Sequence, residues 1–281
     1  EITLLCMNTS KHHTDVNKIP KNYNHYKEIH FVEIDNSITA LGAFSNLFSK
    51  ESYHVSRFIS REYKNELIHL LTENEYDVVQ LETLFLAPYV EVIREYSNAI
   101  ITMRAHNVEH EIWERISKNT TFLPKKLYLN YLTKKLKRFE LSNLNAYDYL
   151  VAVTKKDLKT FKKLGYRNGA IASPIGIDTK SYNYIQKVNR RSNFSLCFIG
   201  SLDWMPNIEG LDWFLQEVWP SMHVKFPNLK LHIAGRNTPA NIMNLNMPNV
   251  IVHGEVEDAI EFLNSHTALV VPLFSGSGMR V

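Results

Sequence analysis

Short apolar runs alternate along the chain with longer segments in which apolar residues recur every three or four positions. The runs typical of buried strands are Ile2–Met7, His30–Ile34, Asp77–Leu81, Ala99–Met103, Tyr149–Val153, Ala170–Ser173, Leu196–Gly200, Leu229–Ala234, Val250–His253 and Ala268–Leu273. The segments with helical periodicity are Phe58–Leu71, Tyr89–Glu95, His110–Ser117, Lys126–Leu144, Lys156–Leu164, Ile208–Lys225 and Ala259–Asn264. This alternation predicts an α/β fold with parallel sheets that helices cover on both faces.

A change in composition beyond the middle of the chain predicts a domain boundary. The strand-like run that ends at Ser173 is followed by Pro174 and Gly176, and then by a polar stretch from Thr179 to Asn193. We therefore expect two facing Rossmann-like domains, over residues 1–178 and 179–281. In such folds ligands gather at the carboxyl ends of the strands, so the cleft between the domains would hold them.

Composition narrows the class of protein. A length of 281 residues suits two domains, and a net charge of +3 permits an anionic partner without requiring one. Cys6 and Cys197 lie in apolar strand-like runs, which favours reduced core residues and a cytoplasmic location. No run approaches the roughly 18 apolar residues of a spanning helix, and no secretory signal opens the chain. The abrupt first and last residues lead us to expect a longer natural protein.

The segment Val270–Val281 reads VVPLFSGSGMRV, an apolar strand that runs into a loop of small residues. The small residues are Ser275, Gly276, Ser277 and Gly278, whose backbone N–H groups could close around an anion. Arg280 follows, where a helix would begin and where a guanidinium fork suits phosphate oxygens. An ordinary strand-to-helix turn is the alternative interpretation.

A second polar cluster follows the fourth strand-like run. His106 stands at the carboxyl end of the predicted sheet, and Asn107 is a suitable N-cap for a helix whose first turn holds Glu109 and Glu111. The same residues spell H-x-x-E-H, in which a zinc protease would use His106 and His110 as ligands and Glu109 as base. That chemistry needs both histidines on one helix face, and a helix that starts only after His106 would separate them.

Two further loops at predicted strand ends combine glycine with small polar or basic residues. Gly200 and Ser201 end a strand in the string FIGSLDWMPNIEG, and Gly235 and Arg236 end the next one in LHIAGRN. Glycine at such positions lets the backbone approach a ligand closely. Together with the loop at residues 275–280, these strand ends suit a nucleotide diphosphate better than a protein partner.

One predicted helix is strongly basic. Its cations are Lys125, Lys126, Lys134, Lys135, Lys137 and Arg138, opposite an apolar stripe of Leu129, Leu132, Leu136 and Phe139. Such a helix can lie on anionic lipid at the inner face of the membrane, or it can be a core helix with a solvated face. No nucleic-acid motif accompanies the charge, so we expect no nucleic-acid partner.

The strings HNVE, GSLDWMPNIEG and GSGMRV, in this order, resemble the family 4 glycosyltransferases, which have the two-domain GT-B fold. The resemblance covers most of the chain. It implies a retaining transfer of a sugar from a nucleotide diphosphate donor, without a metal or other cofactor. UDP is the nucleotide we expect, and the acceptor would be a glycan or a lipid-linked molecule in cell-surface glycan synthesis.

The resemblance also implies roles for particular residues. In that family the histidine matched by His106 contacts the donor sugar, the loop matched by Ser275 to Arg280 cradles the diphosphate, and the residue matched by Val256 lies beside the base. The chain departs from the family in carrying Ser201 and Asn207 where many members have Arg and Lys, so the cationic role would pass to Arg280. Gly276 stands where the family's first glutamate would be. A zinc protease and a non-catalytic GT-B-like scaffold subunit are the alternatives.

Overall fold

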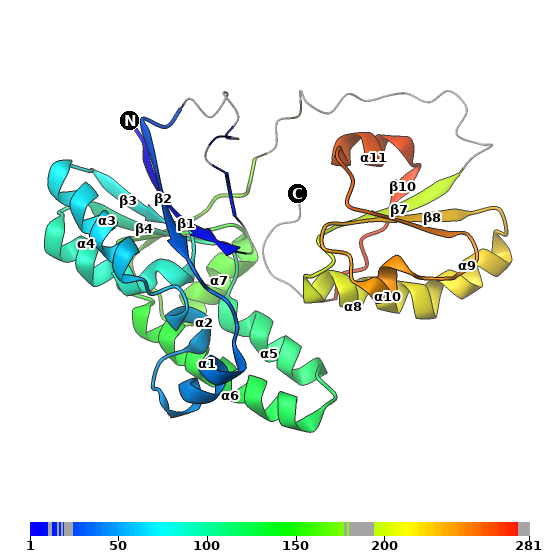
Figure 1. The fold of residues 1–281 in the computed structure, drawn as a ribbon, viewed down its shortest axis with the longest axis horizontal. Helices are drawn as coiled ribbons and strands as arrows, with labels where there is room; N and C mark the ends of the chain where they lie inside the picture. Colours follow the sequence, from blue (N-terminus) through cyan, green and yellow to red (C-terminus); the bar gives the residue numbers. More distant parts are fainter. Residues whose placement is uncertain are drawn as a thin grey trace. The chain divides into compact units, whose positions relative to one another are not determined.

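The computed structural model describes residues 1–10, 13–15, 17, 19, 25–176, 179 and 194–274. These residues form two compact units, the first from Glu1 to Ile175 and the second from Gly176 onward (Figure 1). The domain boundary expected between residues 178 and 179 borders residues outside the described part of the chain, and it stays a prediction.

The first unit alternates strands and helices. Its strands are β1 (Thr3–Thr9), β2 (Glu28–Ile34), β3 (Val78–Leu81), β4 (Ile100–Ala105), β5 (Tyr149–Ala152) and β6 (Gly169–Ala172). Its helices are α1 (Ala40–Ser45), α2 (Tyr53–Ser56), α3 (Arg61–Glu73), α4 (Val90–Tyr96), α5 (Glu109–Asn119), α6 (Leu123–Asn143) and α7 (Lys155–Lys163), with 3-10 turns η3 (Asn46–Phe48) and η4 (Leu84–Tyr89). The strands agree with the predicted runs to within two residues at each end.

These strands form two parallel sheets, β1–β2 and β3–β4–β5–β6. The parallel α/β class predicted from the alternation is thereby confirmed. The core of the unit contains Ile93, Ile101, Leu136 and Leu150, which are almost completely buried. Since Leu136 belongs to α6, the apolar stripe of that helix is core.

An apolar groove of about 310 Å³ lies between β1 and β3. In the described sheets β1 pairs only with β2 and β3 only with β4, so the facing edges of β1 and β3 are not hydrogen-bonded to each other. Helix α3 contributes to the lining, and the hydroxyl of its Tyr63 lies 3.5 Å from the carbonyl oxygen of Leu5. The helix thus connects the two sheets where strand pairing does not.

The second unit has one parallel sheet in the order β10–β7–β8–β9. Its strands are β7 (Ser195–Ile199), β8 (Lys230–Ala234), β9 (Val250–Gly254) and β10 (Ala268–Leu269). Its helices are α8 (Met205–Trp213), α9 (Trp219–Lys225), α10 (Ala240–Met243) and α11 (Ala259–Ser265), with a π-helical turn η6 (Phe214–Val218). Helices α8, α9 and α10 cover one face of the sheet and α11 covers the other (Figure 1).

Two predicted elements of this unit need correction. The strand expected over Ala268–Leu273 ends at Leu269. The N–H of Val270 still donates to the carbonyl of Cys197 at 2.8 Å, and Pro272, which has no N–H, cannot extend the ladder further. The helix expected over Ile208–Lys225 is interrupted by η6, because Pro220, in the first turn of α9, cannot donate the backbone bond of a continuous α-helix. The π-helical turn accommodates the missing backbone hydrogen bond of Pro220.

Cys6 is half-buried, Cys197 is buried, and both are free thiols. Burial raises the pKa of the Cys197 thiol to about 11, so it stays protonated in the core. Among the residues that the structure describes, no helix is both long enough and apolar enough to cross a membrane.

Candidate functional site

His106 lies just after β4, at the carboxyl edge of the larger sheet of the first unit. Its side chain is 40% exposed, and its Nε2 lies 3.1 Å from Oε2 of Glu82, the residue that follows β3. Arg104, on β4, donates to the same oxygen at 3.3 Å, and Gln80 donates to the other carboxylate oxygen. Glu82 therefore holds a histidine and an arginine from the neighbouring strand at one position on the sheet edge.

The helix after His106 does not have the N-cap that the sequence predicts. Helix α5 begins at Glu109, and its N-cap is Val108 rather than the predicted Asn107. Val108 has no side-chain acceptor, and the carboxylate of Glu140 on α6 takes over that role. It accepts hydrogen bonds from the backbone N–H groups of Glu109 at 3.1 Å and His110 at 3.0 Å.

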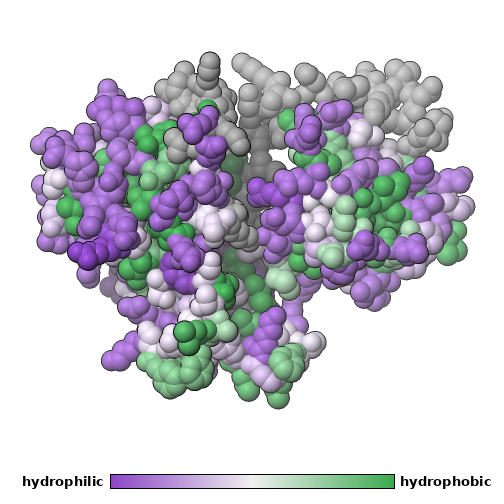
Figure 2. Space-filling view, viewed as in Figure 1, coloured by the Kyte–Doolittle hydropathy of each residue, from purple (hydrophilic) through white to green (hydrophobic). Residues whose placement is uncertain are grey.

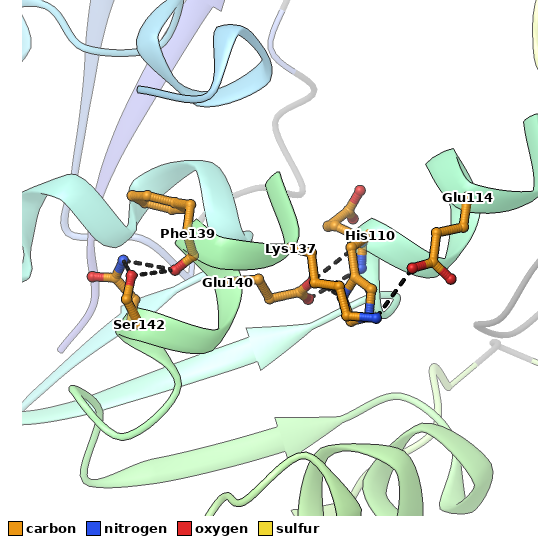
Figure 3. A network of polar contacts seen from close by, with 8 residues as sticks. His110, Glu114, Lys137, Phe139, Glu140 and Ser142 are labelled. Carbon is orange, nitrogen blue, oxygen red and sulfur yellow. Dashed lines mark hydrogen bonds and ion pairs between the residues drawn. The ribbon is translucent and has the colours of Figure 1, made fainter. Parts of the chain in front are cut away.

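Glu140 also binds the side chain of His110 (Figure 3). Nδ1 of His110 lies 2.6 Å from Oε2 of Glu140, and both side chains are almost completely buried. One turn away, Lys137 of α6 pairs with Glu114 of α5 at 3.1 Å. These contacts fix α5 antiparallel to α6, and they thereby fix the segment between β4 and α5 in which His106 lies.

A cavity of about 30 Å³ lies beside His106, and its wall includes Asn107, Glu109 and Glu140. Its volume allows about one water molecule. Burial of the Glu109 carboxyl, and secondarily the charge of Glu140, raise the pKa of Glu109 to about 7. Glu109 therefore exchanges its proton near neutral pH at the wall of the cavity that His106 also lines.

The H-x-x-E-H histidines do not converge. His106 precedes α5 and contacts Glu82, whereas His110 lies on α5 and binds Glu140. The two imidazoles therefore have separate carboxylate partners, and they do not share the helix face that a zinc protease needs. Over the described ranges, no group of three or more His, Cys, Asp or Glu side chains is arranged to hold a metal ion.

In the second unit, glycines bring the ends of three strands together. The N–H of Gly200 donates to the carbonyl of Ala234 at 3.2 Å, and the N–H of Gly235 donates to the carbonyl of Gly254 at 2.7 Å. A Cβ atom on Gly235 would overlap the carbonyl oxygen of Gly200, so only glycine allows this contact. The strand-end loops predicted to bind the donor therefore pack backbone against backbone.

Asp203 links two of these loops through its carboxylate. It accepts from the hydroxyl of Ser201 at 2.6 Å and from the side-chain amide of Asn237 at 3.3 Å. Asn237 has a φ of 56°, in the left-handed region that asparagine tolerates. Arg236 beside it has an exposed side chain, while its carbonyl accepts from the N–H of Leu202 at 2.9 Å. These contacts hold the loop that contains Ser201 next to the loop that contains Arg236.

Val256 follows β9 and packs against a small apolar cluster formed by Cys197, Ala234 and Phe262 under α11. This packing fixes the backbone at Val256, which ends the string HGEV at residues 253–256. The role of Val256 beside a nucleotide base stays a prediction.

Helix α8 lies directly against the segment that precedes the small-residue loop. A Cβ atom on Gly210 would overlap the carbonyl of Pro272, and Trp213 contacts Phe274 edge to face with ring centroids 4.8 Å apart. These contacts fix the start of the predicted diphosphate loop. The predicted loop residues Ser275, Gly276, Ser277, Gly278 and Arg280 lie outside the described residues.

Sequence analysis missed two residues that organise these sites, Glu82 and Asp203. Each comes shortly after a strand, on the same edge as a residue that was predicted, so the position of each in its loop was a usable signal. Glu82 follows β3 as His106 follows β4, and parallel neighbours bring such residues together.

Part of the second unit matches a known protein family. Residues 193–281 match the family of group 1 glycosyl transferases. An uncharacterised 44.6 kDa protein in the cps region of Klebsiella pneumoniae is 22% identical over 188 residues, 64% of this chain and 47% of that protein. The chain thus spans about half the length of this curated relative.

Solved glycosyltransferase structures share the fold of the chain. Sucrose-phosphate synthase from Thermosynechococcus elongatus has a TM-score of 0.58 at 13% identity, over 96% of this chain and 65% of that one. The apo structure of OtsA has a TM-score of 0.51 at 16% identity, over 99% and 72%. TarM has a TM-score of 0.55 at 14% identity, over 75% and 40%. These likenesses, at such identities, establish the GT-B type of fold.

Proposed function

We propose that this protein is a glycosyltransferase that moves a sugar from a nucleoside diphosphate donor to an acceptor. The observation that carries the proposal is the match of residues 193–281 to the group 1 glycosyl transferases, in the unit whose strand-end loops pack through Gly200, Gly235 and Gly254. Close backbone packing of this kind places small residues at the strand ends, where a diphosphate would bind.

The proposed chemistry requires stabilisation of a leaving diphosphate. As the bond from the sugar to the diphosphate breaks, negative charge grows on the phosphate oxygens, and backbone N–H groups of the loop at residues 275–278 with Arg280 would stabilise it. His106 would contact the transferred sugar, held in place by Glu82, which Arg104 also supports. We propose that the transfer retains configuration and needs no metal, so a chelator should leave the rate unchanged.

We further propose UDP as the nucleotide and a glycan or lipid-linked acceptor of a cytoplasmic enzyme. A role in cell-surface glycan synthesis draws support from the curated relative in a cps region. Trehalose-phosphate and sucrose-phosphate synthases are among the proteins of similar fold, so sugar phosphates belong in the acceptor screen beside glycans and lipid-linked sugars.

Thermal unfolding of the protein with UDP, GDP, their sugars or zinc, each in large excess, tests the donor class. A ligand at about 100 times its dissociation constant adds about 2.7 kcal/mol to the free energy of unfolding, a rise of a few degrees in Tm. Stabilisation by one nucleoside diphosphate, followed by its release from the matching donor when acceptor is added, is the expected result.

Other outcomes contradict the proposal. Stabilisation by zinc alone would revive the zinc protease. Binding of a nucleoside diphosphate without transfer to any acceptor or hydrolysis of any donor would favour a non-catalytic GT-B-like subunit. No response to any ligand would remove the support for a donor site.

A further inference from the structure

The first unit exposes several large apolar side chains at one end. Phe48, Leu41 and Phe44, from α1 and η3, are 82%, 79% and 61% exposed. Phe122, Leu123 and Leu127, at the start of α6, are 66%, 63% and 62% exposed. Figure 2 shows hydrophobic surface over α1 and over the turn between α5 and α6, at the bottom of the view. We call these six residues the apolar face.

Direct contacts join the two parts of the apolar face. The hydroxyl of Tyr131 on α6 donates to the carbonyl of Leu47 at 2.7 Å, and the hydroxyl of Tyr128 lies 3.4 Å from the carbonyl of Ala43. Nζ of Lys135 donates to the carbonyl of Asn46. These bonds hold α1 and η3 on α6 through backbone groups, which leaves the phenylalanine and leucine side chains free to point outward.

The two segments that carry the apolar face have charges of one sign only, although Glu51 follows the first of them and Glu114 of α5 pairs with Lys137 of the second. Residues 37–49 contain no charged side chain, and residues 118–139 contain seven cations and no acid. Lys118, Lys125, Lys134 and Arg138 are exposed. Lys135 of α6 is buried, and Lys137 is paired with Glu114. Lys125 lies between Leu123 and Leu127 in the sequence of α6, and Lys134 and Arg138 follow further along the same helix.

We propose that the apolar face docks the protein on an anionic lipid bilayer. Phenylalanine and leucine side chains would enter the boundary between headgroups and acyl chains, and the exposed lysines would pair with anionic headgroups. Charge favours this occupant, because residues 37–49 and 118–139, which carry the apolar face, contain cations and no acid, and such a surface matches an anionic bilayer. The docking is a property of the first unit and does not depend on sugar transfer.

Co-sedimentation of the protein with vesicles tests the proposal without donor or acceptor. We expect binding to vesicles of phosphatidylcholine mixed with phosphatidylglycerol, and much weaker binding to phosphatidylcholine alone. High salt should weaken the binding, since screening acts on the lysine contribution. Failure of the wild-type protein to bind the mixed vesicles would overturn the proposal.

Paired substitutions separate the two contributions. Phe44→Ser with Phe48→Ser should weaken vesicle binding about tenfold or more, because two buried aromatic side chains are lost. Lys125→Glu with Lys134→Glu should weaken binding to mixed vesicles at least several-fold and leave phosphatidylcholine binding unchanged. Val224→Ser is the matched control, because Val224 is 82% exposed but lies in the second unit.

The variants must keep their fold, which circular dichroism and Tm will show. Unchanged vesicle binding in the Phe44 and Phe48 variant would contradict the proposal. Sedimentation velocity completes the test. If the wild-type protein is a dimer and the variant with Phe44→Ser and Phe48→Ser is a monomer, the apolar face binds a second copy of the chain instead.

Discussion

Glu82 and His106 are the residues on which the proposed chemistry most depends. His106 makes a hydrogen bond to Glu82 at 3.1 Å, and its side chain is 40% exposed. If His106 contacts the transferred sugar as bonds change, His106→Ala should lower kcat by about 100-fold or more and change donor affinity little. Steady-state kinetics with the identified donor check this, and His69→Ala, an exposed histidine on α3, is the control. An unchanged kcat would remove His106 from the mechanism.

Glu109 makes the stability of the protein depend on pH. Burial and Glu140 raise its folded pKa to about 7 from an ordinary value of 4.5. Between these values the folded protein keeps a proton that the unfolded chain releases, so stability falls as pH rises from about 4.5 to 7. The full loss is about 3 kcal/mol.

Replacing the carboxyl by an amide removes this titration. Glu109→Gln should therefore gain stability relative to the wild type between pH 5 and pH 8, by up to about 3 kcal/mol. Denaturant unfolding of both proteins at the two pH values measures the difference, with Glu111→Gln, in the same helical turn, as control. Parallel pH profiles of wild type and Glu109→Gln would contradict the assignment.

Between elements, the most informative contact is the one by which α6 caps α5. Glu140→Ala would leave the first N–H groups of α5 and the buried ring of His110 without their acceptor. We expect a loss of about 3 kcal/mol in the free energy of unfolding, in the range for a broken buried pair. Glu114→Ala, which removes the partly exposed pair with Lys137, should cost at most about 1 kcal/mol. Denaturant unfolding compares the two, and equal losses would contradict the capping role.

Gly210 connects α8 to the segment that leads to the predicted diphosphate loop. A methyl group at Gly210 meets the carbonyl of Pro272, so Gly210→Ala must displace one of the two. We expect about 1–3 kcal/mol of destabilisation and weaker nucleotide binding. Gly176→Ala is the control, since a Cβ there would have nothing within 4 Å. Calorimetric titration with UDP gives the affinities, and unchanged binding and stability in Gly210→Ala would contradict a rigid link.

The sequence predicted helices and strands well where hydrophobic periodicity determines them. It predicted them poorly where a distant residue or a proline determines how an element starts or ends. The strands of the first unit were found because buried parallel strands are nearly continuous apolar runs. The cap of α5 was assigned to Asn107 because the true acceptor, Glu140, lies on another helix. The π-helical turn before Pro220 was missed because the apolar stripe continues through it.

At the scale of the whole molecule, the sequence pattern predicted the fold class, and the resemblance predicted the family model that residues 193–281 match. They did not predict a role for Glu82, which depends on β3 and β4 being neighbours. They also did not predict a role for Asp203, whose partners come from two loops. The apolar face was equally hidden, because exposure depends on how α1 and η3 lie on α6. Pairing and exposure are tertiary properties, and periodicity carries no information on them.

The groove between β1 and β3 has a consequence for how the first unit fluctuates. A two-stranded sheet is marginal by itself, and β1–β2 is held to the rest through α3 rather than through a neighbouring strand. Local opening of β1–β2 should therefore need less free energy than opening of β4 and β5 at the centre of the larger sheet. In hydrogen–deuterium exchange, the amides of β1 and β2 should lose protection well before those of β4 and β5. Equal protection would mean that the unit opens only as a whole.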